Sequence, residues 1–158
     1  METNAQTNSS NSPKMPLGIK LILIYLGVGL VFSLFNFETA ALQVGPVLVW
    51  GSVAKSLNLF FIVLVAAIFY GIMKRAVWAK KLYIGYLSVL SSLSLVNLVF
   101  LKINPALYDD YYRNVMKLPT IPDHEFIFNS LIFTCIVSLA VAGLLISYLL
   151  KRKDYFVK

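Results

Sequence analysis

The stretch FIFNSLIFTCIVSLAVAGLLISYLL, residues 126–150, decides the fold class of this chain. It contains no Asp, Glu, Lys, Arg or His. It is also longer than the roughly 20 apolar residues that an α-helix needs to cross a hydrocarbon core of about 30 Å. Basic residues follow it directly at 151–153, which is typical of a helix that ends at a membrane surface. The stretch therefore predicts a membrane-spanning helix.

Three further stretches are long and apolar, at residues 17–35, 55–73 and 82–101, with Lys20 and Lys55 near the starts of the first two. The 158 residues are 59% hydrophobic and 13% charged, with a mean hydropathy of +0.77. An average soluble domain is about 45–50% apolar and about 25% charged, so the composition excludes an ordinary soluble protein. We predict an all-α fold, a polytopic four-helix transmembrane bundle at 17–150. A disordered tail at 1–16 precedes it, and a basic tail at 151–158 follows.

The start of the second span is ambiguous. Residues 46–73 are long for one straight span, and they include Lys55. A charge near the middle of a bilayer costs roughly 2.5–3.5 kcal/mol on insertion scales, so we place Lys55 at the interface and start the span there. Residues 46–54 then form a short interfacial or re-entrant segment, with Trp50 at headgroup level. A longer, tilted helix with a snorkelling Lys55 is the alternative.

The basic residues predict the orientation. With four spans, both termini and the loop at 74–81 fall on the same side of the membrane. Ten of the 14 Lys and Arg residues lie on that side: Lys14, Lys20, Lys74, Arg75, Lys80, Lys81, Lys151, Arg152, Lys153 and Lys158. Because basic residues near span ends stay inside the cell, both termini should be cytoplasmic. This basic surface should attract anionic membrane lipids rather than nucleic acid. Trp78, in the basic loop at 74–81, should be an interface anchor like Trp50.

The outer loop, residues 102–125, should contain a small helix that starts at Pro105 with Asn104 as its cap. The loop also contains Asp123-His124-Glu125. Adjacent helical side chains point about 100° apart, so these three cannot easily chelate one ion, and we expect no metal site. A second group in the loop should anchor it at the interface, or bind a cation or a partner: Tyr108, Asp109, Asp110, Tyr111 and Tyr112.

Each predicted span has one asparagine near its outer end: Asn36, Asn58, Asn97 and Asn129. An amide is unfavourable in hydrocarbon unless it is hydrogen-bonded. We therefore predict a polar cluster at the outer end of the bundle, with Glu38 and Lys55 close above it. The cluster is either a structural hydrogen-bond clasp or a vestibule for a ligand or ion.

Small residues should bring the helices together, because association in lipid depends on close packing and hydrogen bonds. Each span has a pair of small residues four apart: Gly29 and Ser33, Ala67 and Gly71, Ser88 and Ser92, Gly143 and Ser147. We expect the third and fourth spans to pack through a face that comprises Ser88, Ser92, Ser130, Thr134 and Ser138. A hydroxyl-lined conduction path is the alternative.

Catalytic constellations are missing from the sequence. Cys135 is alone in the fourth span, and there is no G-x-S-x-G, P-loop or H-E-x-x-H motif. No Asp, Glu, Lys, Arg or His lies in the interior of the last three spans, which argues against ion-coupled transport. We therefore expect a non-enzymatic structural or accessory subunit, without a cofactor, that contacts itself or other membrane subunits. A small oligomeric channel or passive transporter is the alternative, and a role in lipid interaction is a third reading.

Three segments resemble a group of small, uncharacterised four-span membrane proteins of prokaryotes, mainly archaea. They are PLGIKLILIYLGVGLVF at 16–32, GIMKRAVWAKKLYIGYLSVLS at 71–91 and LLISYLLKRKDYF at 144–156. The residues that match the group's pattern are Pro16, Leu17, Gly18, Gly71, Trp78, Ala79, Tyr148, Leu149, Tyr155 and Phe156. The resemblance covers the cytoplasmic junctions but not the outer loops. It implies four spans in the plasma membrane of a prokaryote, and no particular activity.

Overall fold

The computed structural model describes residues 15–38, 41–120 and 123–157, apart from the side chain of Asp110. The predicted tail at 1–16 lies outside the described residues except for Met15 and Pro16. Four long helices dominate the fold: α1 (Leu17–Phe35), α2 (Gly51–Met73), α3 (Val77–Ile103) and α5 (His124–Lys151). Each is long and apolar enough to cross a membrane, so the predicted all-α bundle is confirmed.

The second helix does not start where the sequence suggested. Residues 41–44 and 47–50 form an antiparallel hairpin, β1 (Ala41–Val44) and β2 (Val47–Trp50), and α2 begins at Gly51. Gly45 opens the two-residue turn with a φ of 59°, a conformation that glycine adopts without strain. The predicted start of the second span at Lys55 is therefore wrong. Residues 47–50 pair as a strand, residues 51–54 already belong to α2, and Lys55 lies within that helix.

The outer loop contains less helix than expected. A 3₁₀ turn, η1 (Pro105–Tyr108), leads into the short helix α4 (Asp109–Asn114). Pro105 occupies the predicted first position, but the side chain of Asn104 makes no capping hydrogen bond. Instead, the backbone amide of Leu107 donates to the Asn104 carbonyl at 3.2 Å.

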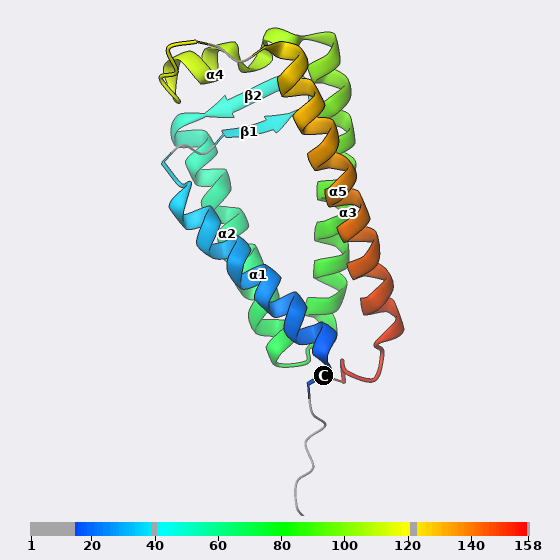
Figure 1. Ribbon diagram of the computed structural model, residues 1–158. Coiled ribbons are helices and arrows are strands. Elements are labelled where there is room, and N and C mark those ends of the chain that lie inside the picture. The colour runs from blue at the N-terminus through cyan, green and yellow to red at the C-terminus, as the bar shows by residue number, and fades with distance from the viewer. Residues whose placement is uncertain (1–14, 39–40, 121–122, 158) are drawn as a thin grey trace, which may run out of the picture.

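The helices pack in chain order, α1 against α2, α2 against α3, and α3 against α5 (Figure 1). Both described termini lie at one end of the molecule, which we call the terminal end, and the hairpin and α4 lie at the opposite, hairpin end. At the terminal end α1 meets α5, where Gly18 faces the ring of Tyr148. Toward the hairpin end the pair α1–α2 diverges from the pair α3–α5.

Most buried side chains belong to one cluster at the terminal half of the bundle. It comprises Ile19, Ile22, Leu26, Ile68, Ile72, Ala76, Ala79, Tyr83, Leu87, Ala142, Leu149, Tyr155 and Phe156. Several residues that carry the resemblance contribute to this cluster or lie beside it. A methyl group placed on Gly71, for example, would lie only 2.5 Å from Cβ of Ala79. The small residue at 71 therefore lets α2 and α3 approach closely.

The last residues of the chain fold back onto the turn between α2 and α3. The Tyr155 hydroxyl donates to the Ile72 carbonyl at 3.1 Å, and the Val157 amide donates to the Arg75 carbonyl at 3.2 Å. The Arg75 guanidinium lies over the Tyr155 ring, 5.2 Å from its centroid. Arg75 itself has a φ of 60°, and it ends α2 with the paired bonds of a Schellman motif: Ala76 N–H to Gly71 C=O and Arg75 N–H to Ile72 C=O.

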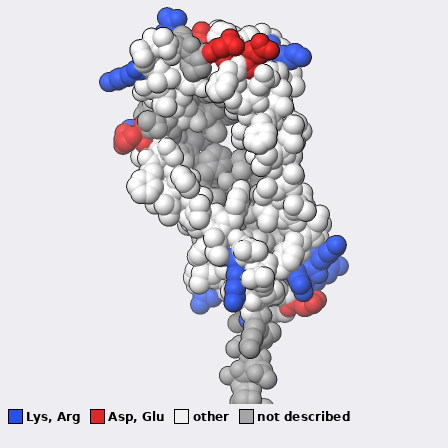
Figure 2. Space-filling view, viewed as in Figure 1, with Lys and Arg blue, Asp and Glu red and all other residues white. Residues whose placement is uncertain are grey.

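Most charged side chains in Figure 2 gather at the two ends of the molecule, and one charged group lies at the left edge between them. The rest of this face is uncharged. The same face is hollowed below the hairpin. An uncharged band between two charged ends is the surface that a membrane-spanning protein presents to lipid.

Candidate functional site

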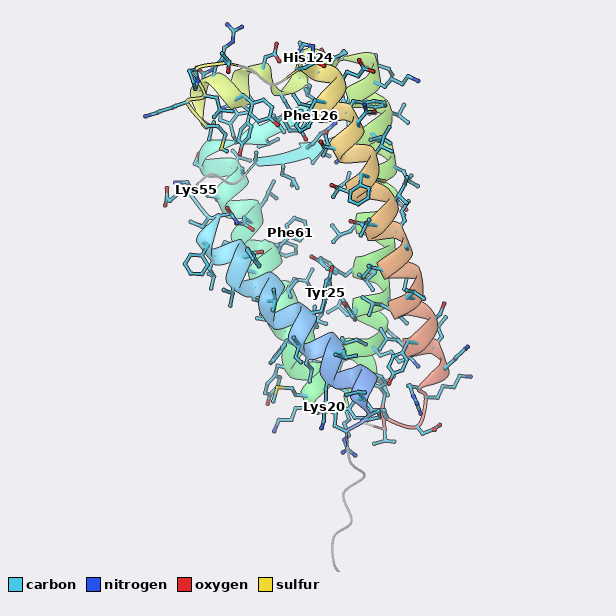
Figure 3. The ribbon with its side chains drawn as sticks, in the orientation of Figure 1. Lys20, Tyr25, Lys55, Phe61, His124 and Phe126 are labelled. Atoms are coloured by element: carbon cyan, nitrogen blue, oxygen red, sulfur yellow. The ribbon has the colours of Figure 1, made fainter. Side chains whose placement is uncertain are left out.

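Three cavities lie below the hairpin, in the space between the two helix pairs. We call them the outer cavity, the hydroxyl cavity and the deep cavity, and the whole space the lateral hollow. The outer cavity, about 450 Å³, is lined by α1, α2, β1 and the α4 region. The hydroxyl cavity, about 130 Å³, lies between β1, α3 and α5. The deep cavity, about 150 Å³, lies between α1, α2 and α3. Figure 3 shows Tyr25 and Phe61 pointing toward this space.

Asn97 joins α3 to the hairpin. Its Nδ2 donates to the Gln43 carbonyl at 2.8 Å, and its Oδ1 accepts from the Gly45 amide at 2.9 Å. Gln43, which is 7% exposed, donates in return from Nε2 to the backbone carbonyls of Asn97 and Gly45. The Gln43 Oε1 accepts from the Tyr108 hydroxyl at 3.0 Å. These residues form the hairpin clasp: Gln43, Gly45, Asn97 and Tyr108.

Gln43 and Tyr108 were not predicted to belong to this network. The available signal was the two-residue Gly45-Pro46 turn between short apolar runs, which is a hairpin pattern. A hairpin there places Gln43 on one strand, so its side chain needs a partner once it is buried. Burial raises the pKa of the Tyr108 phenol above its ordinary value, and the neighbouring Tyr112 and Tyr111 phenols raise it further.

The other three predicted asparagines do not join the clasp. Asn36 and Asn58 both line the outer cavity. The Asn36 Nδ2 donates to the Phe32 carbonyl of its own helix at 3.0 Å, and the Asn58 Nδ2 donates across to the Ser33 carbonyl of α1 at 3.3 Å. Asn129 is exposed on α5. The structure therefore places Asn36 and Asn58 at one cavity, Asn97 in the hairpin clasp and Asn129 on the surface, rather than all four amides in one cluster.

The predicted charged pair lies at the hairpin end. Lys55 Nζ binds the Glu38 carboxylate, and the Lys55 side chain is one-third exposed. Because the pair is neutral as a whole, the charge of Lys55 is compensated where α2 begins.

The hydroxyl residues expected between the third and fourth spans are exposed: Ser88, Ser92, Ser130, Thr134 and Ser138. Their helices α3 and α5 do pack along each other. Ser88 donates to the Ile84 carbonyl and Thr134 donates to the Ser130 carbonyl, each at 2.9 Å, so both hydroxyls are satisfied within their own helices. Thr134 and Ser138 also line the hydroxyl cavity, together with Ser94, Asn97 and Cys135.

The outer loop brings His124 to Asp109 rather than to its own sequence neighbours. His124 Nε2 and Asp109 Oδ1 are 2.9 Å apart. The rings of Tyr108, Tyr111 and Tyr112 pack with centroids 5.7–6.4 Å apart. Within the described part of the chain, no three His, Cys, Asp or Glu residues come together as metal ligands.

The two tryptophans lie at opposite ends of the molecule. Trp50 ends β2 at the hairpin end, where it is 38% exposed. Trp78 lies in the first turn of α3 at the terminal end, where it is 49% exposed. These positions suit indoles at the two membrane surfaces.

No family model matches this chain, and neither a curated protein nor a solved structure does. The resemblance to small archaeal four-span proteins therefore stays a prediction. What the chain does has to be inferred from its own surfaces and cavities.

Proposed function

We propose that this multi-pass membrane protein is a non-enzymatic structural or accessory subunit of a membrane assembly. It acts through helix–helix contacts with further copies of itself or with other membrane subunits. The proposal places it in the plasma membrane of a prokaryote, with the basic terminal end on the cytoplasmic side, because basic residues near span ends stay inside.

The observation that supports this proposal is a set of small residues on outward faces of α3 and α5. A methyl group placed on Gly85 or Gly143 would meet no atom within 4 Å. Beside these glycines, Ser88, Ser92 and Ser147 are exposed. Within the chain, Gly71 already serves as a close contact between helices. Small residues that none of the described helices covers offer the same kind of contact to a helix of another subunit.

The test is native mass spectrometry of the protein extracted from its host membrane in a mild detergent, with and without Gly143→Leu and Gly85→Leu. Because both positions face open space, the variants should fold while a leucine prevents close approach of a partner helix. We expect wild type to retain other subunits or further copies, and the variants to lose them. A wild type that is monomeric, or variants that keep the same partners, would overturn the proposal.

Gly29→Leu is the matched control. Gly29 also has open space around it, but it lines the deep cavity instead of an outward face. It should therefore leave the association with other subunits unchanged.

A small oligomeric channel or passive transporter is the second candidate, and the hydroxyl cavity supports it. Pores can be lined by hydroxyl groups and backbone carbonyls. Thr134 and Ser138 line this cavity from successive turns of α5, and Ser94 lines it from α3. Ion flux into liposomes that contain the protein tests this candidate. Flux that Ser138→Leu abolishes would support it, whereas liposomes as tight as protein-free ones would exclude it.

A further inference from the structure

The lateral hollow is closed at both ends and open along its side. At the terminal end, a methyl group placed on Gly18 would lie 2.3 Å from Cζ of Tyr148, so α1 and α5 are in contact there. At the hairpin end, the hairpin crosses between the helix pairs and is bonded to Asn97. A helix about 10 Å wide that spans the whole bilayer does not fit between these two closures. A flexible chain that enters from the side does.

The outer cavity is polar at the hairpin end. It is lined by Asn36 and Asn58, and the Nδ2 atom of each is engaged by a carbonyl of α1. No described residue donates a hydrogen bond to either Oδ1 atom, so both oxygens remain acceptors at this cavity. An occupant that donates hydrogen bonds matches this surface.

The deep cavity is mainly apolar and continues from the outer one. The two share Ser33 and Phe61 as lining residues. Gly29 leaves space on the α1 side of the deep cavity. Most of the lining is aliphatic, from Leu26, Leu30, Ile62, Val65, Leu87 and Leu90, and the side chains of Tyr25, Tyr83 and Tyr86 complete it. The pair of cavities is therefore more polar near the end of the spans and more apolar at membrane depth. A lipid of that leaflet has the same order, with its headgroup near the end of the spans and its chains at membrane depth.

We propose that the outer and deep cavities bind one lipid from the leaflet at the hairpin end, with a headgroup that donates hydrogen bonds and one chain in the deep cavity. This goes beyond the proposed function, because it concerns the interior of the hollow rather than the outward faces of α3 and α5. An acyl chain gains little by leaving other lipid tails, so selection depends on the headgroup. Since Glu38 compensates Lys55, the donor groups of the headgroup decide affinity, rather than its net charge.

Phosphatidylethanolamine and phosphatidylcholine with identical acyl chains are the matched probes. Both are zwitterionic, but only the ethanolamine ammonium has N–H donors. Titration of the delipidated full-length protein in detergent, followed by native mass spectrometry, measures the affinity of the first lipid bound. We expect phosphatidylethanolamine to bind about tenfold more tightly, as the loss of one or two hydrogen bonds implies.

Two variants locate the binding. Gly29→Leu fills the deep cavity and should weaken phosphatidylethanolamine binding at least tenfold. Asn36→Leu removes one acceptor, so the preference for phosphatidylethanolamine over phosphatidylcholine should fall about threefold, while circular dichroism shows an unchanged fold. Gly143→Leu, on the outward face of α5, should leave lipid binding unchanged even where it abolishes subunit association.

Equal affinity of wild type for the two lipids would overturn the proposal. So would a bound lipid that survives Gly29→Leu, because that lipid would be bound to the outer surface. A co-purifying protein that Gly29→Leu displaces would show that the hollow holds a polypeptide instead. The Gly143→Leu result is independent of these outcomes, so failure of the lipid site and failure of the subunit role are distinguishable.

Discussion

Replacing Asn97 by leucine removes the side chain that attaches the hairpin to α3. The side-chain amide makes two hydrogen bonds to the hairpin backbone. Its Nδ2 donates to the Gln43 carbonyl, and its Oδ1 accepts from the Gly45 amide. Leucine leaves both backbone groups without these partners. An unsatisfied buried group costs about 1–3 kcal/mol. The site lies near the end of the spans, where water relieves part of this cost, so we expect Asn97→Leu to lower the free energy of unfolding by about 2–4 kcal/mol.

Tryptophan fluorescence in detergent, during unfolding by denaturant, measures this loss. The chain has two tryptophans, so Trp78→Phe leaves Trp50, at the end of β2, as the reporter of the hairpin. Asn97→Asp is the informative second variant. Its carboxylate still accepts from the Gly45 amide but no longer donates to the Gln43 carbonyl, so its stability should lie between wild type and Asn97→Leu.

Asn129→Leu is the control, because Asn129 is also an asparagine near the end of a helix but is exposed. It should not lower the free energy of unfolding. If Asn97→Leu unfolds at the same denaturant concentration as Asn129→Leu, the hairpin clasp does not stabilise the fold, and the reasoning from its hydrogen bonds fails.

Three more predictions concern the terminal end and the outer loop. Gly18→Val places a side chain into the ring of Tyr148 and should destabilise the fold by about 1–3 kcal/mol in thermal unfolding. Tyr155→Ala should cost about 3–5 kcal/mol, because the ring is 7% exposed and its hydroxyl binds the α2–α3 turn, whereas Val157→Ala, at a side chain that is 65% exposed, should be neutral. The free energy of unfolding should fall as the pH rises above about 10, because burial raises the pKa of Tyr108 in the folded state and the unfolded chain then loses this proton first. Tyr108→Phe should reduce that fall in pH titrations of stability.

The helices were predictable because hydrocarbon imposes a simple requirement on sequence. Each spanning segment must satisfy its backbone groups internally and present apolar side chains, and α1 follows this rule to its predicted bounds of 17–35. The hairpin was missed because its strands are only four residues long. Apolar runs of that length do not distinguish a strand from the start of a helix. In addition, the charge of Lys55 suggested that the second span starts there, but its pairing with Glu38 makes that boundary unnecessary.

The candidate site was only partly predictable for a related reason. That Asn58 and Asn97 need partners follows from their residue type and depth, but which partners they find depends on tertiary structure. Asn97 binds backbone groups of the hairpin, and Asn58 binds a carbonyl of α1. Sequence spacing along one helix carries no information about either contact, and it gives no sign that the two helix pairs diverge.

The contacts at the two ends of the lateral hollow also determine how it can deform. Because α1 meets α5 at Gly18 and the hairpin is bonded to α3 at Asn97, neither helix pair can swing away about a single hinge. The width of the side opening changes only when α1 or α5 bows in its middle, and bowing of a continuous helix is stiff compared with rotation about a loop. Entry and departure of an occupant should therefore be slow relative to the exchange of lipids that merely surround the protein. Breaking either end contact should speed that exchange.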